Sequence, residues 1–348
     1  MYSLLKPFIF KIDPEMAHDL AIKSLKYNFL PEELFKVENE SILETKIFNL
    51  NIKNPIGLAA GFDKSAEVYN SLFRFGFGII EVGTITPKEQ FGNPKPRVFR
   101  LENDKALINR LGFNNDGLEK VCKRLQKNSP TGILGINVGP NKDSKNRVDD
   151  YLQCIKDVQS FASYITINIS SPNTPGLRDF HDENSLKNLL KTITEFTQKN
   201  KIQKPLALKV SPDIEESEIG YIIELIKKFR ISGVVISNTT DKNRENLKGK
   251  HKNEEGGLSG EPLNNISNNL IKKFYKEING KISIIGVGGV NSGLTAYEKL
   301  RSGANLLQLY TGMIYEGPGI VKKIKTELIE ILKKEKIKNI NEIVGTGS

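Results

Sequence analysis

The 348-residue sequence contains no tryptophan, only two cysteines and only three histidines. Cys122 and Cys154 are too few for a disulfide framework, a structural zinc site or an iron–sulfur cluster. His18, His181 and His251 lie far apart in the sequence, so a Ser/His/Asp triad would need a long-range coincidence. We therefore expect no metal site, and a reducing compartment is the simplest interpretation of the cysteine count.

Long hydrophobic runs are also missing. No apolar run reaches the roughly 18 residues that a membrane-spanning helix needs, and the first residues lack the pattern of a secretory signal. The composition, with 38% hydrophobic and 26% charged residues, is that of an ordinary globular protein and excludes collagen, coiled coil and disorder. The length fits one large α/β barrel with a small appendage.

The formal net charge is +10, from 51 Lys and Arg against 41 Asp and Glu. Such a charge is compatible with binding to nucleic acid, to an anionic membrane or to an anionic small molecule. It is equally compatible with a basic surface that is simply solvated. The lysines lie mostly in helix-like segments interleaved with Glu, which is typical of a solvated surface.

Eight short apolar runs rich in β-branched residues occur from residue 56 onward, each followed by a segment with helical periodicity. This alternation is typical of parallel strands with helical crossovers. The predicted strands are Ile56–Ala60, Gly78–Thr84, Ile133–Val138, Tyr164–Ile169, Leu206–Val210, Gly233–Asn238, Ile282–Val287 and Leu306–Tyr310. Because these runs are apolar throughout, a closed (β/α)8 TIM barrel fits better than an open doubly wound sheet.

Helices are predicted between the strands, for example at Ser65–Phe75, Arg147–Phe161, Glu215–Phe229 and Ser292–Ser302. Within Pro94–Leu111, the runs Arg97–Arg100 and Ala106–Ile108 predict a small hairpin inserted into a loop. The last residues, Ile337–Ser348, are typical of a loosely ordered end.

Residues 1–39 stand apart, and we predict that they form a helical extension to a catalytic barrel domain of residues 40–348. Two segments carry apolar residues at helical spacing, and Asp13 followed by Pro14 predicts the N-cap of the second helix. Lysines beside the apolar faces suit helices that lie at a membrane interface. Helices that merely pack on the barrel would show the same pattern.

Polar or glycine-rich residues follow every predicted strand, and the active site of a barrel is built at the carboxyl ends of its strands. Gly286-Val-Gly-Gly289 follows the seventh strand and Gly312 the eighth, where barrels commonly bind phosphate through backbone N–H groups. Their spacing is not that of the Rossmann fingerprint, and glycines can also serve tight turns alone. We expect a phosphorylated cofactor at this position.

Lys64 and Lys209 stand at the ends of the first and fifth predicted strands. A charged residue at the end of a buried strand is costly unless it meets an anion, so both lysines are candidates for binding a carboxylate or a reduced cofactor. Five asparagines at strand ends or adjoining loops would suit a planar ligand rich in donors and acceptors, although each could be a structural amide. These are Asn109, Asn137, Asn168, Asn173 and Asn238.

Several motifs together resemble the dihydroorotate dehydrogenase family, flavin enzymes of pyrimidine synthesis. The resemblance covers essentially the whole chain, with the motifs in the expected order and spacing. Ser171 and the N-terminal extension resemble the quinone-dependent, membrane-associated branch (class 2), because the soluble branch has a cysteine base and no extension. The motifs are Gly57-Leu-Ala-Ala-Gly-Phe-Asp-Lys64, Asn109-Arg-Leu-Gly-Phe-Asn-Asn115, Asn168-Ile-Ser-Ser-Pro-Asn-Thr-Pro-Gly-Leu-Arg178, Ser237-Asn-Thr-Thr240, Gly256-Gly-Leu-Ser-Gly260 and Ile285-Gly-Val-Gly-Gly289.

The resemblance implies oxidation of (S)-dihydroorotate to orotate in UMP biosynthesis, with FMN as hydride acceptor. The implied FMN-binding residues are Ala60, Gly61, Phe62, Asp63, Lys64, Thr84, Asn137, Asn168, Lys209, Ser237, Gly260, Gly289, Tyr310 and Thr311. The implied substrate-binding residues are Lys64, Asn109, Arg110, Leu111, Gly112, Phe113, Asn168, Asn173, Asn238 and Thr239.

The resemblance further implies a membrane quinone as electron acceptor, with His18, Arg100 and Tyr310 near its head group. It implies a monomer, peripheral to the lipid bilayer on the cytoplasmic face of a bacterial cell membrane, with no nucleic acid as partner. Ser171 is implied as the catalytic base, yet a serine hydroxyl is a poor base near neutral pH. We hypothesise that a relay through Thr174 and water activates it.

Two other functions fit parts of this sequence pattern. A tRNA dihydrouridine synthase is also a flavin-binding barrel and would suit the positive charge. That family uses a catalytic cysteine and carries an RNA-binding domain, for which the residues after Ile320 leave no room. A non-catalytic module that binds a phosphorylated ligand would leave Lys64, Lys209 and Ser171 without a purpose.

Overall fold

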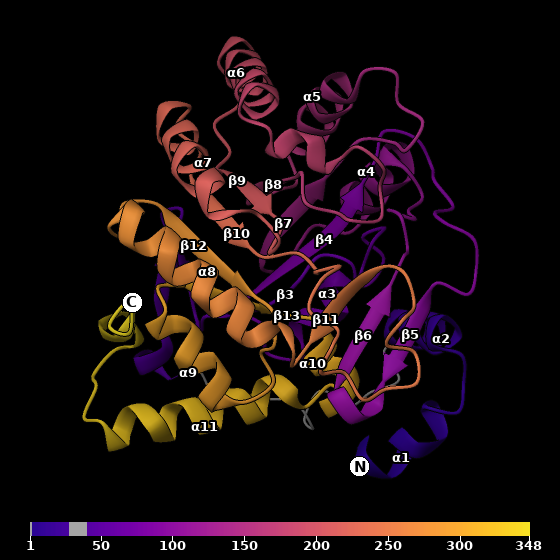
Figure 1. Cartoon of the computed structure of the whole chain (residues 1–348), viewed down its shortest axis with the longest axis vertical. Helices are drawn as coiled ribbons and strands as arrows, with labels where there is room; N and C mark the ends of the chain where they lie inside the picture. Colours follow the sequence, from indigo (N-terminus) through magenta and orange to yellow (C-terminus); the bar gives the residue numbers. More distant parts are fainter. Residues whose placement is uncertain (1, 28–39) are drawn as a thin grey trace.

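Eight parallel strands close into a barrel at the centre of the computed structural model, which describes residues 2–27 and 40–348 (Figure 1). Their order around the barrel is β10-β12-β13-β3-β4-β7-β8-β9. The strands are β3 (Ile56–Leu58), β4 (Ile79–Ile85), β7 (Ile133–Val138), β8 (Tyr164–Asn168), β9 (Leu206–Val210), β10 (Gly233–Ile236), β12 (Ser283–Val287) and β13 (Leu306–Leu309). The predicted (β/α)8 fold is confirmed.

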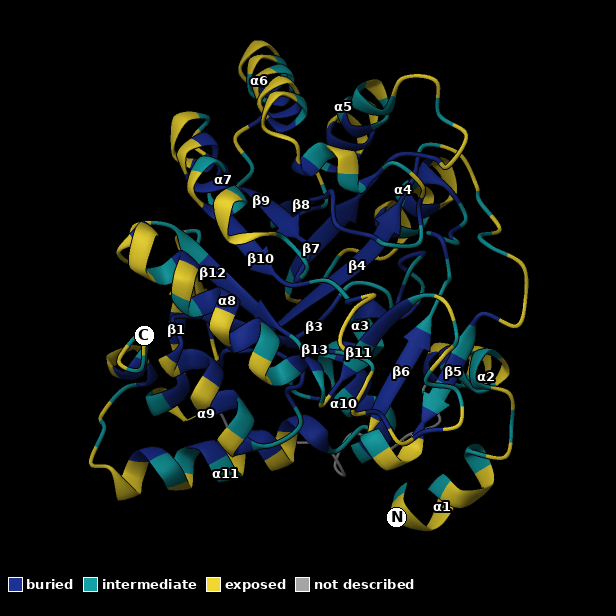
Figure 2. Cartoon of the chain, in the orientation of Figure 1, coloured by how far each residue is buried: buried dark blue, intermediate teal, exposed yellow. Residues whose placement is uncertain are grey.

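Helices surround this barrel and bury their apolar faces against it, while their outer faces stay exposed (Figure 2). They are α3 (Tyr69–Phe73), α4 (Leu118–Lys127), α5 (Arg147–Val158), α6 (Glu183–Lys199), α7 (Glu216–Lys228), α8 (Leu263–Ile278), α9 (Gly293–Arg301), α10 (Thr311–Glu316) and α11 (Ile320–Lys334). Helix α3 is shorter than predicted. The Asp63 carboxylate accepts hydrogen bonds from the backbone of Glu67 and Val68, and Ala66 has a positive φ of 51°, so the chain turns before the helix begins.

A hairpin of β1 (Thr45–Ile47) and β2 (Leu50–Ile52) covers the amino-terminal end of the barrel. Its turn places Phe48 and Asn49 at positive φ. The Phe48 ring lies 5.4 Å from the ring of Tyr164, the first residue of β8. This end of the barrel is therefore closed by packed side chains, and the opposite end is left for a site.

The predicted inserted hairpin is present as β5 (Val98–Leu101) and β6 (Ala106–Asn109). A third strand, β11 (Gly257–Gly260), pairs antiparallel with β6 and was not predicted. The three strands enclose a small apolar core of their own that includes Phe99, Ile108 and Leu258. This sheet stands over the carboxyl ends of the barrel strands and forms one wall of the site described below.

The N-terminal residues form α1 (Tyr2–Ile9) and α2 (Pro14–Lys26), which lie beside β5 and α10 (Figure 1). As predicted, Asp13 caps α2, because its carboxylate accepts hydrogen bonds from the backbone N–H groups of Glu15 and Met16. The predicted boundary at residue 39 lies outside the described residues. None of the helices that the structure describes is long and apolar enough to cross a membrane.

The prediction of a loosely ordered C-terminal end is wrong. Residues Ile340–Ile343 form a 3₁₀ turn (η5) whose Ile340 and Ile343 are buried. Asn341 accepts a hydrogen bond from the Thr45 hydroxyl (2.7 Å) and donates to the Glu44 carbonyl (3.2 Å). These partners lie about 300 residues away in sequence, so no local pattern could reveal them.

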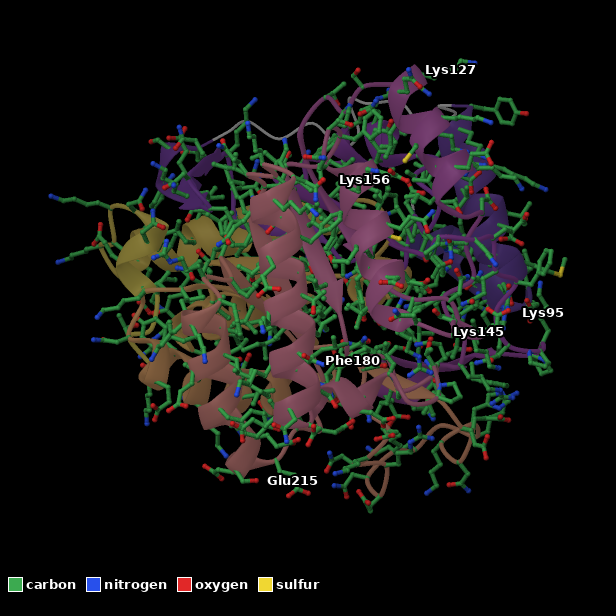
Figure 3. The ribbon with its side chains drawn as sticks, turned by 90° about the horizontal axis from the view of Figure 1, so that it is seen from above. Lys95, Lys127, Lys145, Lys156, Phe180 and Glu215 are labelled. Atoms are coloured by element: carbon green, nitrogen blue, oxygen red, sulfur yellow. The ribbon has the colours of Figure 1, made fainter. Side chains whose placement is uncertain are left out.

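Many of the lysines lie on the outer surface, where exposed side chains such as Lys127, Lys145 and Lys156 extend into solvent (Figure 3). Within residues 2–27 and 40–348, no three His, Cys, Asp or Glu side chains gather in a way that could hold a metal ion.

Candidate active site

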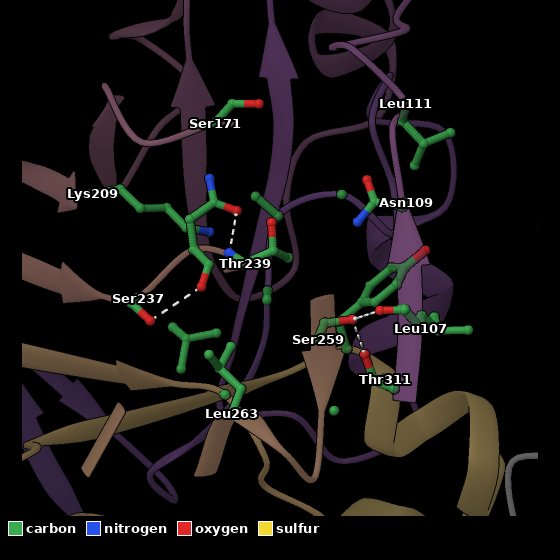
Figure 4. A pocket seen from close by; sticks show the side chains of 18 of the residues that line it. Leu107, Asn109, Leu111, Ser171, Lys209, Ser237, Thr239, Ser259, Leu263 and Thr311 are labelled. Carbon is green, nitrogen blue, oxygen red and sulfur yellow. Dashed lines mark hydrogen bonds between the residues drawn. The ribbon is translucent and has the colours of Figure 1, made fainter. Parts of the chain in front are cut away.

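A cavity opens at the carboxyl ends of the barrel strands and is lined by residues that lie between Ala59 and Gly312 in the sequence (Figure 4). In Figure 4, Lys209 and Asn109 extend from opposite walls toward the same space. Most of the predicted FMN- and substrate-binding residues line it. These are Ala60, Gly61, Lys64, Thr84, Asn109, Leu111, Gly112, Phe113, Asn168, Asn173, Lys209, Ser237, Asn238, Thr239, Gly260, Gly289, Tyr310 and Thr311. Ser171, the predicted catalytic base, lines the same cavity.

Four predicted residues do not line this cavity. Phe62 lines a neighbouring cavity instead. Asp63 is buried behind the first loop and caps the turn before α3, and burial raises its pKa to about 6. Asn137 lies one layer below Thr84, whose hydroxyl donates to it (2.6 Å). The Arg110 guanidinium turns outward and pairs with Glu254 (2.9 Å).

The loop after β8 is held in place from several directions. The Ser171 hydroxyl accepts a hydrogen bond from the backbone N–H of Asn173 (3.2 Å), and the Asn173 amide donates to the Asn109 carbonyl (3.0 Å). Arg178 closes the loop by pairing with Asp213 (3.0 Å) and donating to the Thr239 carbonyl (3.3 Å). Ser171 therefore sits on a fixed backbone with its hydroxyl at the cavity wall, as a group that acts on a bound substrate requires.

A chain of buried amides and hydroxyls forms the floor of the cavity. The Asn168 amide donates to the Thr84 hydroxyl (3.0 Å), and Thr84 donates to Asn137. Asn137 in turn donates to the carboxylate of Glu81 (2.8 Å). Each donor is matched to an acceptor, so the orientation of every amide is fixed by the Glu81 carboxylate beneath it.

Glu81 was missed in the sequence, although a single charged residue inside an apolar strand is a detectable signal. It is completely buried in the barrel and also accepts hydrogen bonds from the hydroxyl of Tyr164 (2.9 Å) and the amide of Gln308 (2.8 Å). Its three donors come from three different strands, far apart in sequence.

Two lysines supply positive charge to the cavity. Burial lowers the pKa of Lys64 to about 8, with Glu15 opposing the shift and Arg97 adding to it. Burial also lowers the pKa of Lys209, against the opposing effect of Glu81. Among the described residues, no carboxylate forms an ion pair with either ammonium. Both charges are therefore available to an anionic ligand.

The glycine loop after β12 provides a surface of exposed backbone. Gly288 and Gly289 line the cavity with φ of 115° and 73°, a conformation that side chains rarely adopt. A Cβ on Gly289 would lie 2.7 Å from the Asn264 backbone, at the start of α8. At these two positions the loop thus presents backbone groups and no side chains to the cavity. Exposed backbone N–H groups of this kind are suited to binding a phosphate group.

A second, larger cavity of about 750 Å³ lies between the N-terminal helices and the barrel. The predicted quinone residues His18, Arg100 and Tyr310 all line it. The His18 ring lies edge-on to Phe62 (5.0 Å between centroids), and burial, followed by the Lys64 charge, lowers the pKa of His18 to about 3. Lys64 and Tyr310 line both cavities, so the two spaces adjoin.

Comparisons with known proteins agree with this geometry. The sequence profile of the family described as dihydroorotate dehydrogenase matches residues 42–332. A protein of Bartonella tribocorum named "Dihydroorotate dehydrogenase (quinone)" is 47% identical over 96% of this chain and 93% of its own length. A protein of Christiangramia forsetii with the same name is 44% identical over 94% and 98%. The crystal structure of DHODH from Eimeria tenella in complex with ferulenol superposes with a TM-score of 0.91 at 38% identity, covering 96% of this chain and 95% of that one.

Proposed function

The chain belongs to the dihydroorotate dehydrogenase family, and we propose that it oxidises (S)-dihydroorotate to orotate and passes the electrons to a quinone. This is an oxidoreductase step of pyrimidine synthesis. One observation carries the proposal: a single cavity, whose wall includes a bare glycine loop, is lined by Ser171, four asparagines and two lysines that form no ion pair within the described residues. The four asparagines are Asn109, Asn168, Asn173 and Asn238.

The cofactor that fits this cavity is FMN. Its phosphate would lie on Gly288 and Gly289, and the buried amide floor would meet the polar edge of its ring. A bound flavin supplies the hydride acceptor of the reaction. Lys209 would then stabilise negative charge on the reduced ring, because a buried ammonium interacts strongly with an adjacent anion. No second nucleotide-binding motif is present in the sequence, which favours FMN over FAD.

The substrate carboxylate would pair with Lys64, and the asparagine amides would bind the ring amides and carbonyls of dihydroorotate. Ser171 would remove the ring proton. Its relay partner Thr174 is buried, and within the described part of the chain its hydroxyl oxygen has no hydrogen-bond partner. A buried hydroxyl without a partner supports a water-filled relay, since such groups are rarely left unsatisfied.

The second cavity would take the quinone. It is lined mostly by apolar side chains, and His18 and Arg100 are among its polar lining residues. Arg100 is held by the carbonyls of Phe10 (3.2 Å) and Ile12 (2.8 Å), so the α1–α2 connection and the inserted sheet together fix its position. Exposed apolar residues on α1 and α2 support peripheral docking to a lipid bilayer, at the cytoplasmic face of a bacterial cell membrane. We further propose that the protein acts as a monomer.

The visible absorption spectrum of the purified protein tests this function directly. We expect a yellow protein whose flavin band disappears when dihydroorotate is added without oxygen and returns when quinone is added. Mass analysis of the released flavin should give FMN. A colourless protein would favour a binding module without redox chemistry, and a flavin that dihydroorotate fails to reduce would remove the proposed substrate.

A further inference from the structure

Lys299, on α9, is a completely buried lysine that the proposed reaction does not use. Its ammonium donates to the hydroxyl of Ser267 (3.1 Å) and to the amide oxygen of Asn268 (2.5 Å), both on α8. Its stem packs on β12, where a Cβ added to Gly286 would lie 2.9 Å from the side chain. The ammonium is thus fixed between two helices and the strand that leads into the glycine loop.

The contacts of Lys299 lead directly to that loop. Ser267, its hydrogen-bond partner, also donates to the Val287 carbonyl (2.6 Å). A Cβ added to Gly288 would lie 3.3 Å from the Ser267 side chain. Gly288 and Gly289 line the cavity and Lys299 does not, so the ammonium lies behind the loop, one layer away from any ligand on its open side.

No anion compensates this charge within the described residues. No carboxylate forms an ion pair with Lys299, and the carboxylate that acts on it from a distance is Glu298, which is exposed to solvent. Burial without a counter-ion lowers the pKa of Lys299 to about 7. Proteins rarely bury a lysine in this way, because its desolvation is costly unless an anion offsets it.

We propose that Lys299 is a positioning residue for the flavin phosphate: its ammonium stands behind the glycine loop and stabilises the phosphate dianion bound on the open side. This inference rests on the proposed FMN site. The loop amides supply direct hydrogen bonds, and the protonated form of Lys299 supplies a positive charge behind them. A phosphate dianion on the open side of the loop would in turn favour that protonated form over the neutral amine. Riboflavin lacks the phosphate, so its affinity for the protein should not depend on the charge of Lys299.

The test compares FMN with riboflavin in full-length variants. The Kd of each flavin is measured from the fluorescence of free flavin after dilution or reloading. In Lys299→Met the Kd of FMN should rise by about ten-fold or more, and the Kd of riboflavin by less than about two-fold. Riboflavin binding also reports that the variant is folded.

A second variant separates charge from hydrogen bonding. Lys299→Gln is neutral but can still donate toward Ser267 and Asn268, so we expect it to lose FMN affinity as Lys299→Met does. If Lys299→Gln keeps the full preference for FMN over riboflavin, the hydrogen bonds matter and the charge proposal is wrong.

Lys325→Met is the matched control, because Lys325 is a second buried lysine, on α11, and it does not line the cavity. Its preference for FMN should equal that of the wild type, and an equal loss there would make the effect general and overturn the proposal. A wild-type protein that binds no FMN would refute the proposed function itself. A wild type that prefers FMN while Lys299→Met keeps the same preference would refute only the role of Lys299.

Discussion

The Ser171 hydroxyl lies at the cavity wall, where it accepts a hydrogen bond from the backbone N–H of Asn173, and we propose it as the base that acts on the substrate. We expect Ser171→Ala to slow flavin reduction by dihydroorotate by about 10²- to 10⁴-fold, the range that general bases contribute. The bound flavin should be unaffected. Stopped-flow measurement of the absorption band gives the rate.

Ser171→Cys provides the companion measurement. A thiol has a lower pKa than a hydroxyl, so this variant should recover activity as the pH rises. Near-normal flavin reduction in Ser171→Ala would show that the base lies elsewhere on the cavity wall.

The pKa of Lys64 predicts how the binding of orotate depends on pH. Burial lowers its pKa to about 8, and only the ammonium form can pair with the carboxylate of orotate. Below this pKa the charge is present and binding is strong. As the pH rises through about 8 the free site loses its proton, so the Kd of orotate should increase by up to about ten-fold per pH unit.

Titration of the flavin spectrum with orotate between about pH 6.5 and 9 measures this slope. Lys64→Met should bind orotate weakly at every pH and lose the slope. The prediction fails if the Lys64→Met protein retains the pH dependence of the wild type, since another group would then bind the carboxylate of orotate.

At the scale of elements, α2 is tied to the barrel by a buried ion pair. Arg97, before β5, pairs with Glu15 of α2 (2.6 Å) and also donates to the carbonyls of Phe91 (2.6 Å) and Asn93 (2.8 Å). Asn93 donates in turn to the carbonyl of Asn173, on the loop of Ser171 (3.3 Å). The extension is thus packed against the site and builds one side of the second cavity.

Deleting residues 1–39 should therefore separate the two half-reactions. Quinone reduction should fall by about a hundred-fold or more, because the deletion removes His18 and one wall of the second cavity. Flavin reduction by dihydroorotate should remain, since Ser171, the asparagines and Lys64 belong to the barrel. Separate anaerobic measurements of the two rates test this.

Full-length Glu15→Gln is the control for the truncation. It weakens the pair with Arg97 but keeps a side chain of the same size at this position of the second cavity, and His18, Arg100 and Tyr310 are intact, so quinone reduction should persist. If the truncated protein still reduces quinone at the full rate, the extension does not form the quinone site.

Strand and helix prediction succeeded where the signal is local. The eight barrel strands were found because their apolar runs are continuous, and the cap at Asp13 because its spacing is fixed by the helix. Strand β11 was missed because Gly257–Gly260 has low strand propensity and is held only by pairing with β6. The order of the C-terminal turn and the role of Glu81 also depend on partners distant in sequence.

For the site, the sequence predicted which residues lie near the cavity better than it predicted where their side chains point. Residues at strand ends were identified because a barrel places them on one rim, so Lys209, Asn168 and Ser237 are together in the cavity. Arg110 and Asp63 belong to the same motifs, yet their side chains serve neighbouring loops. A sequence motif predicts where the backbone of each of its residues lies. The direction of each side chain depends on the packing around it, which the motif does not contain.

On the scale of the whole molecule, several of the large apolar side chains that the structure leaves exposed lie on α1 and α2. Leu4, Phe8 and Met16 on α1 and α2 are 75%, 69% and 58% exposed. None of the three lines either cavity. An apolar patch on two short helices, beside the mouth of an apolar cavity, is suited to docking on a bilayer.

Replacing Leu4, Phe8 and Met16 together by serine should release the protein from anionic lipid vesicles. Each large apolar side chain contributes up to about 1.5–3 kcal/mol when it leaves water, so the triple variant should lose at least about a hundred-fold in vesicle affinity. Reduction of the flavin by dihydroorotate should not change, and neither should reduction of a water-soluble quinone analogue, because His18, Arg100 and Tyr310 are intact. Leu294→Ser is the matched control, since Leu294 is 57% exposed on α9, away from α1 (Figure 1). Vesicle co-sedimentation measures binding, and a triple variant that sediments like the wild type would show that another face of the barrel meets the membrane.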